Sequence, residues 1–175
     1  AASAIVNYRR ARDLDPQSSL ADDALWWGGR LLQAAGRFDD AAAQYATLVS
    51  DYRGSKWAAD AGFGRGLALY SGGDRSSAAR IWSTLADATD SDGLRARFWR
   101  GRALTEDGDA EGNRILQALV SEPAAAGDFY ALRAEVLLGK NVAAIKQPKI
   151  DARTPDWKRL AQYLTDVRAT ETADG

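Results

Sequence analysis

Residues 23–55 read DALWWGGRLLQAAGRFDDAAAQYATLVSDYRGS, and this stretch decides the fold. Small and apolar residues recur at helical spacing on both sides of Gly36, which predicts one helix at about 19–35 and a second at about 38–51. The first half then returns twice, as an aromatic–glycine–leucine–glycine pattern with the same internal spacing of 3, 3 and 4 residues. The pattern stands at Trp26, Gly29, Leu32 and Gly36, then at Phe63, Gly66, Leu69 and Gly73, and again at Phe98, Gly101, Leu104 and Gly108.

These copies are offset by 37 and then by 35 residues, and a period of that length around a helix–turn–helix is typical of a stacked helical repeat. A two-helix unit cannot bury its apolar face alone, so neighbouring units bury it jointly. We therefore predict an all-α protein, an α-solenoid of stacked antiparallel helix hairpins. Residues 1–139 are predicted to hold a half repeat at 3–16, repeats at 19–54, 55–90 and 91–123, and a closing helix at 123–139.

The remaining residues do not continue the repeat. Residues 140–153 have no clear period and contain Pro148, so we interpret them as a linker. Residues 154–169 carry an apolar stripe at helical spacing, which predicts a helix that docks on the stack. Residues 170–175 are expected to be a disordered tail.

Glycine in the middle of a helix costs about 1 kcal/mol relative to alanine, and it recurs here at Gly29, Gly66 and Gly101. A cost repeated at one register needs a cause. We predict that the second helix of each hairpin approaches closely there, with its small residues Ala41 and Ala78 facing the glycines.

The third repeat departs from the pattern. Asn113 and Gln117 stand where the earlier copies have an alanine and an aromatic residue. We interpret this as decay of the repeat toward the end of the stack, where a unit has different neighbours. Trp82 and Trp99, at repeat core positions, are expected to fill the space between helices.

Composition excludes several classes of function. The net charge of −1 argues against nucleic acid or an anionic membrane surface as a partner bound by bulk electrostatics. The 175 residues include no cysteine and no histidine, which removes disulfides, thiolate metal sites and the commonest general base. No apolar run approaches the roughly 20 residues that span a bilayer. We expect no metal and no cofactor.

The repeat register resembles the tetratricopeptide repeat. Positions that match its small, large and aromatic consensus are Gly29, Leu32, Gly36, Ala41, Tyr45 and Leu48, and then Gly66, Leu69, Gly73, Ala78, Trp82 and Leu85. Two consensus positions differ, because a tryptophan near the start of the first helix is replaced by Leu25, Gly62 and Arg97, and a leucine before its glycine by Gly28, Arg65 and Arg100.

A second resemblance concerns the end of the repeats. The segments RARFWRGRAL at 95–104 and GDFYALRAEVLLG at 127–139 are similar to the helical superhelix of bacterial soluble lytic transglycosylases. That resemblance implies a periplasmic or extracytoplasmic scaffold of the cell envelope, beside a domain that cleaves peptidoglycan. The family's catalytic glutamate–serine pair is absent, since no glutamate here precedes a serine. We therefore expect a non-catalytic chain. The alternative is a tetratricopeptide adaptor that binds proteins in envelope assembly or cell division.

The tetratricopeptide resemblance also implies a ligand groove on the inner surface, formed by the first helix of each repeat. Its ligand would be a peptidoglycan strand or a protein segment, because rings stack on sugars and guanidinium groups pair with carboxylates. An inner face that is only solvated and partly covered by its own side chains is the alternative. The residues carried over to this groove are Trp26, Arg30, Gln33, Asp60, Phe63, Leu67, Tyr70, Arg95, Phe98, Arg102, Thr105 and Glu106.

Overall fold

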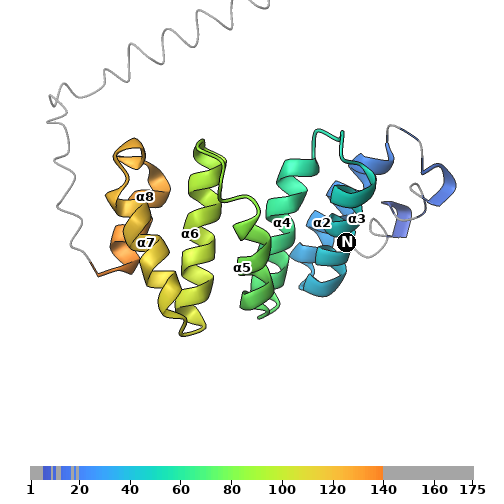
Figure 1. Cartoon of the computed structure of the whole chain (residues 1–175). Helices are drawn as coiled ribbons and strands as arrows, with labels where there is room; N and C mark the ends of the chain where they lie inside the picture. The colour runs from blue at the N-terminus through green and yellow to red at the C-terminus, as the bar shows by residue number, and fades with distance from the viewer. Residues whose placement is uncertain (1–5, 9, 11–12, 17, 19, 140–175) are drawn as a thin grey trace, which may run out of the picture. The chain divides into compact units, whose positions relative to one another are not determined.

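The computed structural model describes residues 6–8, 10, 13–16, 18 and 20–139 (Figure 1). The half repeat predicted at 3–16 lies partly outside these residues, and the segments predicted at 140–153, 154–169 and 170–175 lie wholly outside them. In the described part after residue 20, all regular structure is helical. Its helices are α2 (Ala21–Ala34), α3 (Phe38–Asp51), α4 (Ala58–Ser71), α5 (Arg75–Ser83), α6 (Ser91–Glu106), α7 (Ala110–Ser121), the 3-10 turn η1 (Pro123–Ala125) and α8 (Phe129–Leu137).

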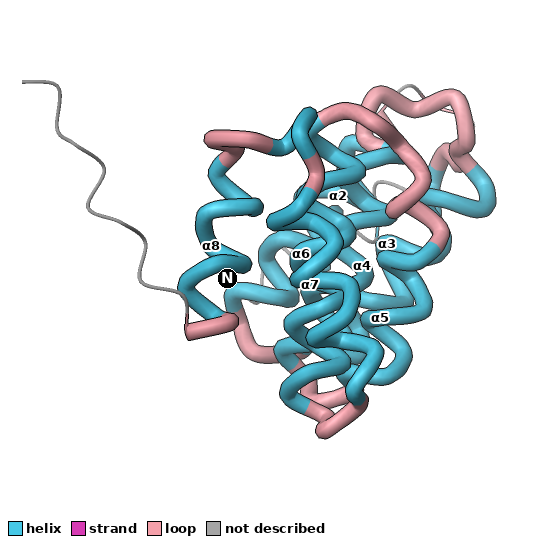
Figure 2. Tube along the Cα trace, turned by 60° about the vertical axis from the view of Figure 1, so that its left-hand side comes forward, coloured by secondary structure: helices cyan, strands magenta, loops and turns pink. Residues whose placement is uncertain are grey.

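The helices form three hairpins, α2/α3, α4/α5 and α6/α7, that stack in chain order, and α8 packs on α6 and α7 (Figures 1 and 2). Each helix contacts the next one along the chain, which is the nearest-neighbour packing of a repeat array. The buried core is correspondingly divided into three clusters, two at the junctions between successive hairpins and one between the third hairpin and α8. The predicted fold class, an all-α solenoid of helix hairpins, is confirmed.

Glycine ends the first helix of every hairpin in the left-handed conformation. Gly36, Gly73 and Gly108 have φ of 73°, 95° and 78°, which a side chain would strain. The chain then turns back at once, because the Gly36 N–H donates to the Gln33 carbonyl and the next N–H to the Leu32 carbonyl. This turn places the start of the second helix directly beside the end of the first.

The mid-helix glycines do permit close approach, but the predicted partner was wrong. A Cβ at Gly29 would lie 2.6 Å from Cε1 of Tyr45, and one at Gly66 would overlap the indole of Trp82. The nearest atoms therefore belong to the large aromatic residue of the second helix and not to Ala41. The glycine is needed because a fully buried ring packs directly against the backbone of the first helix.

The third repeat is shifted by one residue and has not decayed. Leu116 lies against Gly101, where its Cγ would be 2.8 Å from an added Cβ, and it is 1% exposed. Gly112 faces the backbone of α6 directly. Asn113 and Gln117, which stand at the expected register, are exposed. The helix has turned so that a glycine and a leucine occupy the positions of the alanine and the aromatic residue.

The closing helix predicted at 123–139 is interrupted. Pro123 starts only the short 3-10 turn η1, and Gly127 then adopts a φ of 80°. The Asp128 carboxylate accepts a hydrogen bond from the Tyr130 N–H and so caps a separate helix, α8. A short helix preceded by a sharp turn can pack across both α6 and α7.

Candidate functional site

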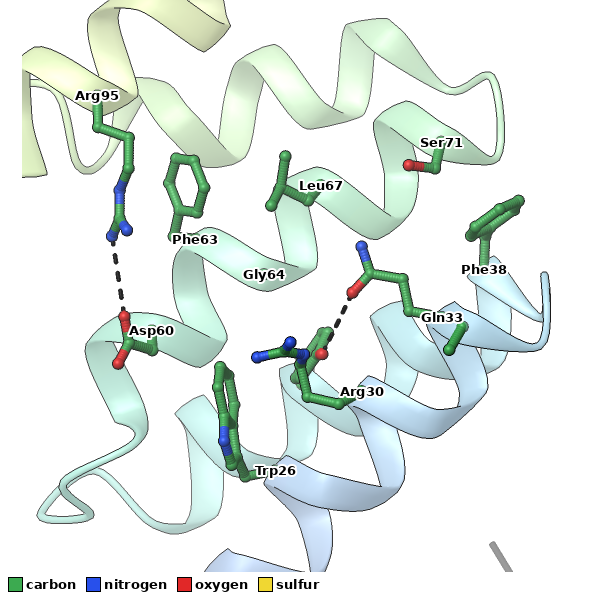
Figure 3. Close-up of a pocket in the computed structure, with 12 residues that line it drawn as sticks. Trp26, Arg30, Gln33, Phe38, Asp60, Phe63, Gly64, Leu67, Ser71 and Arg95 are labelled. Carbon is green, nitrogen blue, oxygen red and sulfur yellow. Dashed lines mark hydrogen bonds and ion pairs between the residues drawn. The ribbon is translucent and has the colours of Figure 1, made fainter. Parts of the chain in front are cut away.

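A groove of about 680 Å³ lies along the first two repeats, with α2 on one side and α4 on the other (Figure 3). One residue of α6, Arg95, bounds it at the far end. Two members, Phe38 and Tyr45, come from α3. The residues that line the groove are Trp26, Arg30, Gln33, Ala34, Phe38, Tyr45, Asp60, Phe63, Gly64, Leu67, Ser71 and Arg95.

The structure brings part of the predicted inner surface together here. Seven of the residues carried over from the resemblance line the groove, namely Trp26, Arg30, Gln33, Asp60, Phe63, Leu67 and Arg95. They share a face because they recur at three- and four-residue steps along α2 and α4. Sequence reasoning missed Phe38, although its place directly after the Gly36 turn puts it beside the ends of the first helices.

Trp26 forms one wall, and its ring is already in contact on several sides. It stacks on Trp57 with ring centroids 5.0 Å apart, and tilts against Tyr45 at 5.7 Å. The guanidinium of Arg30 lies 5.6 Å from its ring centroid. Trp26 is only 7% exposed, so it shapes the groove without presenting a free ring face.

Arg30 is the exposed cation of this wall. Within the described residues no ion pair joins a carboxylate to its guanidinium, which lies over the ring of Trp26. Burial raises the pKa of the Tyr45 hydroxyl to about 12, and the positive charge of Arg30 opposes this rise. Tyr45 therefore stays neutral, and its hydroxyl donates to Oε1 of Gln33 at 3.3 Å.

Phe63 and Arg95 form the opposite end. The Arg95 guanidinium lies 3.9 Å from the Phe63 ring centroid, and its Nη2 is 3.1 Å from Asp92 and 3.9 Å from Asp60 (Figure 3). The Nε atom of Arg95 is buried and has no hydrogen-bond partner among the described residues. This cation is thus held by stacking and by two partly exposed carboxylates, and one of its donors is unused.

Three other predicted residues form a separate cluster. Tyr70 and Arg102 both donate to the carboxylate of Glu106, from the Tyr70 hydroxyl at 2.5 Å and from Arg102 Nε at 2.9 Å. Arg75, from the start of α5, donates to the same carboxylate at 3.0 Å. These three donors already satisfy the Glu106 carboxylate, and the cluster therefore connects α4, α5 and α6. It lies outside the groove.

Phe98 was predicted to face the ligand, but it is 1% exposed. Tyr130 of α8 lies 5.7 Å from its ring centroid, and Arg133 lies 5.6 Å away on the same helix. Within the described chain α8 packs against Phe98, whereas Trp26 and Phe63 line the groove. Thr105 has also turned inward, because its hydroxyl donates to the Gly101 carbonyl.

The side chains that line the groove are of kinds that bind ligands. It combines two cations, one amide and a strip of apolar side chains, all on rigid helices. No cluster of histidine, cysteine, aspartate or glutamate within the described ranges could hold a metal ion. No described helix is both long enough and apolar enough to cross a bilayer.

Comparison with known proteins agrees with the repeat architecture. Residues 23–55 match the family model of the tetratricopeptide repeat, which is the stretch that forms α2 and α3. No curated protein and no solved structure matches the chain. The protein is thus an α-helical solenoid with a repeat similar to one found in generally non-catalytic modules that bind proteins or peptides. None of the comparisons supports the resemblance to lytic transglycosylases.

Proposed function

We propose that this solenoid is a protein-interaction adaptor whose groove between α2 and α4 binds an extended segment of a partner protein. The observation that carries the proposal is Arg30, an exposed guanidinium without a carboxylate partner among the described residues, beside an apolar strip formed by Phe38 and Leu67. A guanidinium on a rigid helix pairs well with a carboxylate. The preferred segment would carry an acidic group next to an apolar side chain.

A peptide fits the groove better than a sugar does. A sugar needs an open ring face to stack on, yet Arg30 lies over Trp26 and Arg95 lies over Phe63. Both rings are 7% exposed. The groups that line the groove include the guanidinium groups of Arg30 and Arg95, the carboxylate of Asp60, the amide of Gln33 and apolar side chains. This mixture of donors, acceptors and apolar surface suits a peptide backbone with alternating side chains.

Peptides selected by display on the immobilised chain would test this proposal, with affinities then measured by calorimetry. Arg30→Gln should weaken binding of a selected acidic peptide about 10- to 100-fold, as expected for loss of a charge-assisted hydrogen bond of about 1.5–3 kcal/mol. Arg37→Gln is the matched control, because Arg37 does not line the groove and its guanidinium pairs with Asp40. Equal losses in both variants would argue against the groove.

A role in the bacterial cell envelope is the second candidate. Its support is the sequence similarity of residues 95–104 and 127–139 to the transglycosylase superhelix, which implies a scaffold for a peptidoglycan-cleaving domain in the periplasm or outside the cytoplasm. Titration with solubilised peptidoglycan fragments, followed by tryptophan fluorescence, separates the two candidates. Saturable quenching that Trp26→Ala removes would favour a glycan strand as ligand, and a flat titration would favour the adaptor.

A further inference from the structure

A second recessed surface lies on the other side of the stack, where α6 is flanked by α5 and α7. It consists of two hollows of about 280 Å³ and about 400 Å³ that share the residue Arg100. We name it the outer trough and define it by Ala79, Arg80, Arg100, Leu104, Ile115 and Ala118. None of these residues lines the groove between α2 and α4.

The outer trough and the groove use opposite faces of α6. Successive residues of an α-helix are rotated by about 100°, so Arg97, Arg100 and Leu104 lie about 200°, 140° and 180° around the axis from Arg95. Arg95 bounds the groove, whereas the other three line the trough. A segment bound in one site therefore leaves the other site open.

The trough exists because α5 is short. It ends at Ser83 after 9 residues, whereas α3 has 14. Residues 84–90 form turns and bends instead, and Ala86–Thr89 become one wall of the larger hollow. Gly93 fixes this wall, because an added Cβ there would overlap the Ala88 carbonyl oxygen.

Most charged groups in the trough have a described partner, and two do not: Asp87, which is exposed, and Arg100. Glu122 pairs with Arg97, Glu111 pairs with Arg114, and the Asp109 carboxylate caps α7. Arg80 donates to the Ser77 hydroxyl at 2.7 Å. Arg100, half-buried where the two hollows meet, has no ion pair or hydrogen bond within the described chain.

We infer that the outer trough binds a second protein segment, one whose carboxylate side chain pairs with Arg100. Small apolar side chains beside that carboxylate would contact Ala79 and Ala118, which line the two hollows. A half-buried guanidinium without a partner is the feature that a carboxylate complements, and pairing there is shielded better than on an open surface. The adaptor would then hold two segments on opposite faces of one helix.

The sequence supplies a matched control at the same repeat position. Arg65 precedes Gly66 as Arg100 precedes Gly101. It is also half-buried, but it lines neither hollow. Substitution of Arg100 should therefore weaken binding of an acidic segment in the trough, and substitution of Arg65 should not.

The test is a nuclear magnetic resonance titration of the full chain with the acetylated, amidated peptide Leu-Ala-Glu-Ala-Leu, and with its glutamine counterpart. The acidic peptide should shift the Arg100 Nε–Hε and Ile115 methyl signals saturably. Arg100→Gln should weaken this binding about tenfold or more, as loss of a charge-assisted contact does, and Arg65→Gln and Arg30→Gln should not. Arg100→Gln should keep the wild-type melting temperature, because Arg100 has no described partner to lose.

Three results would overturn the inference. They are equal shifts with the glutamine peptide, equal weakening by Arg65→Gln, and the absence of any shift at Ile115. Shifts confined to residues such as Leu67 would show that the acidic peptide uses only the groove, which would support the proposed function and reject the trough. Binding lost in Arg30→Gln but kept in Arg100→Gln would lead to the same conclusion.

Discussion

The second helix of a hairpin contacts the first through one large side chain, but the first two repeats and the third do this differently. Tyr45 and Trp82 place an aromatic ring on the glycine of the first helix, and both are fully buried. Leu116 does the same in the third repeat from a register one residue earlier. Because leucine is smaller than an aromatic ring, α6 and α7 approach each other more closely than the helices of the first two hairpins do.

The closer approach is visible at Gly112. An added Cβ there would overlap the backbone N–H of Thr105 and lie 2.6 Å from the Gly101 carbonyl oxygen, so the two helix backbones nearly touch. In the first two repeats Ala41 and Ala78 occupy this place and are completely buried. The comparison teaches that close packing is kept when the large and the small residue both shrink, because the two helices then lie closer together.

The largest effect we expect is at the leucine contact. Leu116→Ala should lower the free energy of unfolding by about 2–5 kcal/mol, because it removes a buried side chain from a contact between two helix backbones that cannot move closer. Gln117→Ala, at the register that simple repetition would assign, should change it by less than about 0.5 kcal/mol. Urea denaturation of both variants checks the shift, and a larger loss for Gln117→Ala would contradict it.

A smaller effect is expected at the aromatic contact. Gly66→Ala should destabilise the protein by about 1–3 kcal/mol, because the methyl group would overlap the buried indole of Trp82. Gly62→Ala lies on the same helix one turn earlier, where an added Cβ meets Leu85 and Val49 only at 4.0 Å. It should stabilise by about 0.4–1 kcal/mol through the unfolded chain. A raised melting temperature for both variants would show that the lower entropy of the unfolded chain outweighs the overlap with Trp82, and a lowered one for both would contradict the expected gain at Gly62.

The sequence was sufficient for features that depend on local chemistry. The turns at Gly36, Gly73 and Gly108 follow from helix-ending glycine. The residues of α2 and α4 that line the groove were named from the resemblance to the tetratricopeptide repeat, which assigns the inner positions of the first helix.

It was insufficient where a distant segment decides the outcome. Phe98 has the same local pattern as Trp26, yet α8 covers it. The shift to Leu116 is equally invisible locally, because leucine and glutamine next to each other permit either register until the helices pack.

A last contrast separates the cations of the two junctions. At the groove Arg30 has no described carboxylate partner, whereas Arg75 and Arg102 share Glu106 with Tyr70. Burial raises the Glu106 pKa, but hydrogen bonds from Tyr70, Arg102 and Arg75 outweigh it and hold the pKa below its usual value of 4.5. Burial and the bond to Glu106 raise the Tyr70 pKa, so its hydroxyl remains a donor at neutral pH.

The pH dependence follows from the lowered Glu106 pKa. The network stabilises the folded chain above the unfolded pKa of about 4.3, and this contribution is lost as the pH falls through the lower, folded pKa. Glu106→Gln should therefore cost less than about 1 kcal/mol at pH 7, since the cluster is partly exposed, and the difference from wild type should close as the pH falls through the lowered folded pKa of Glu106. Urea unfolding from neutral to acidic pH measures it, with Glu111→Gln as the control because Glu111 pairs only with Arg114 on its own helix. A difference that persists at acidic pH would mean that Glu106 contributes through packing and not through its charge.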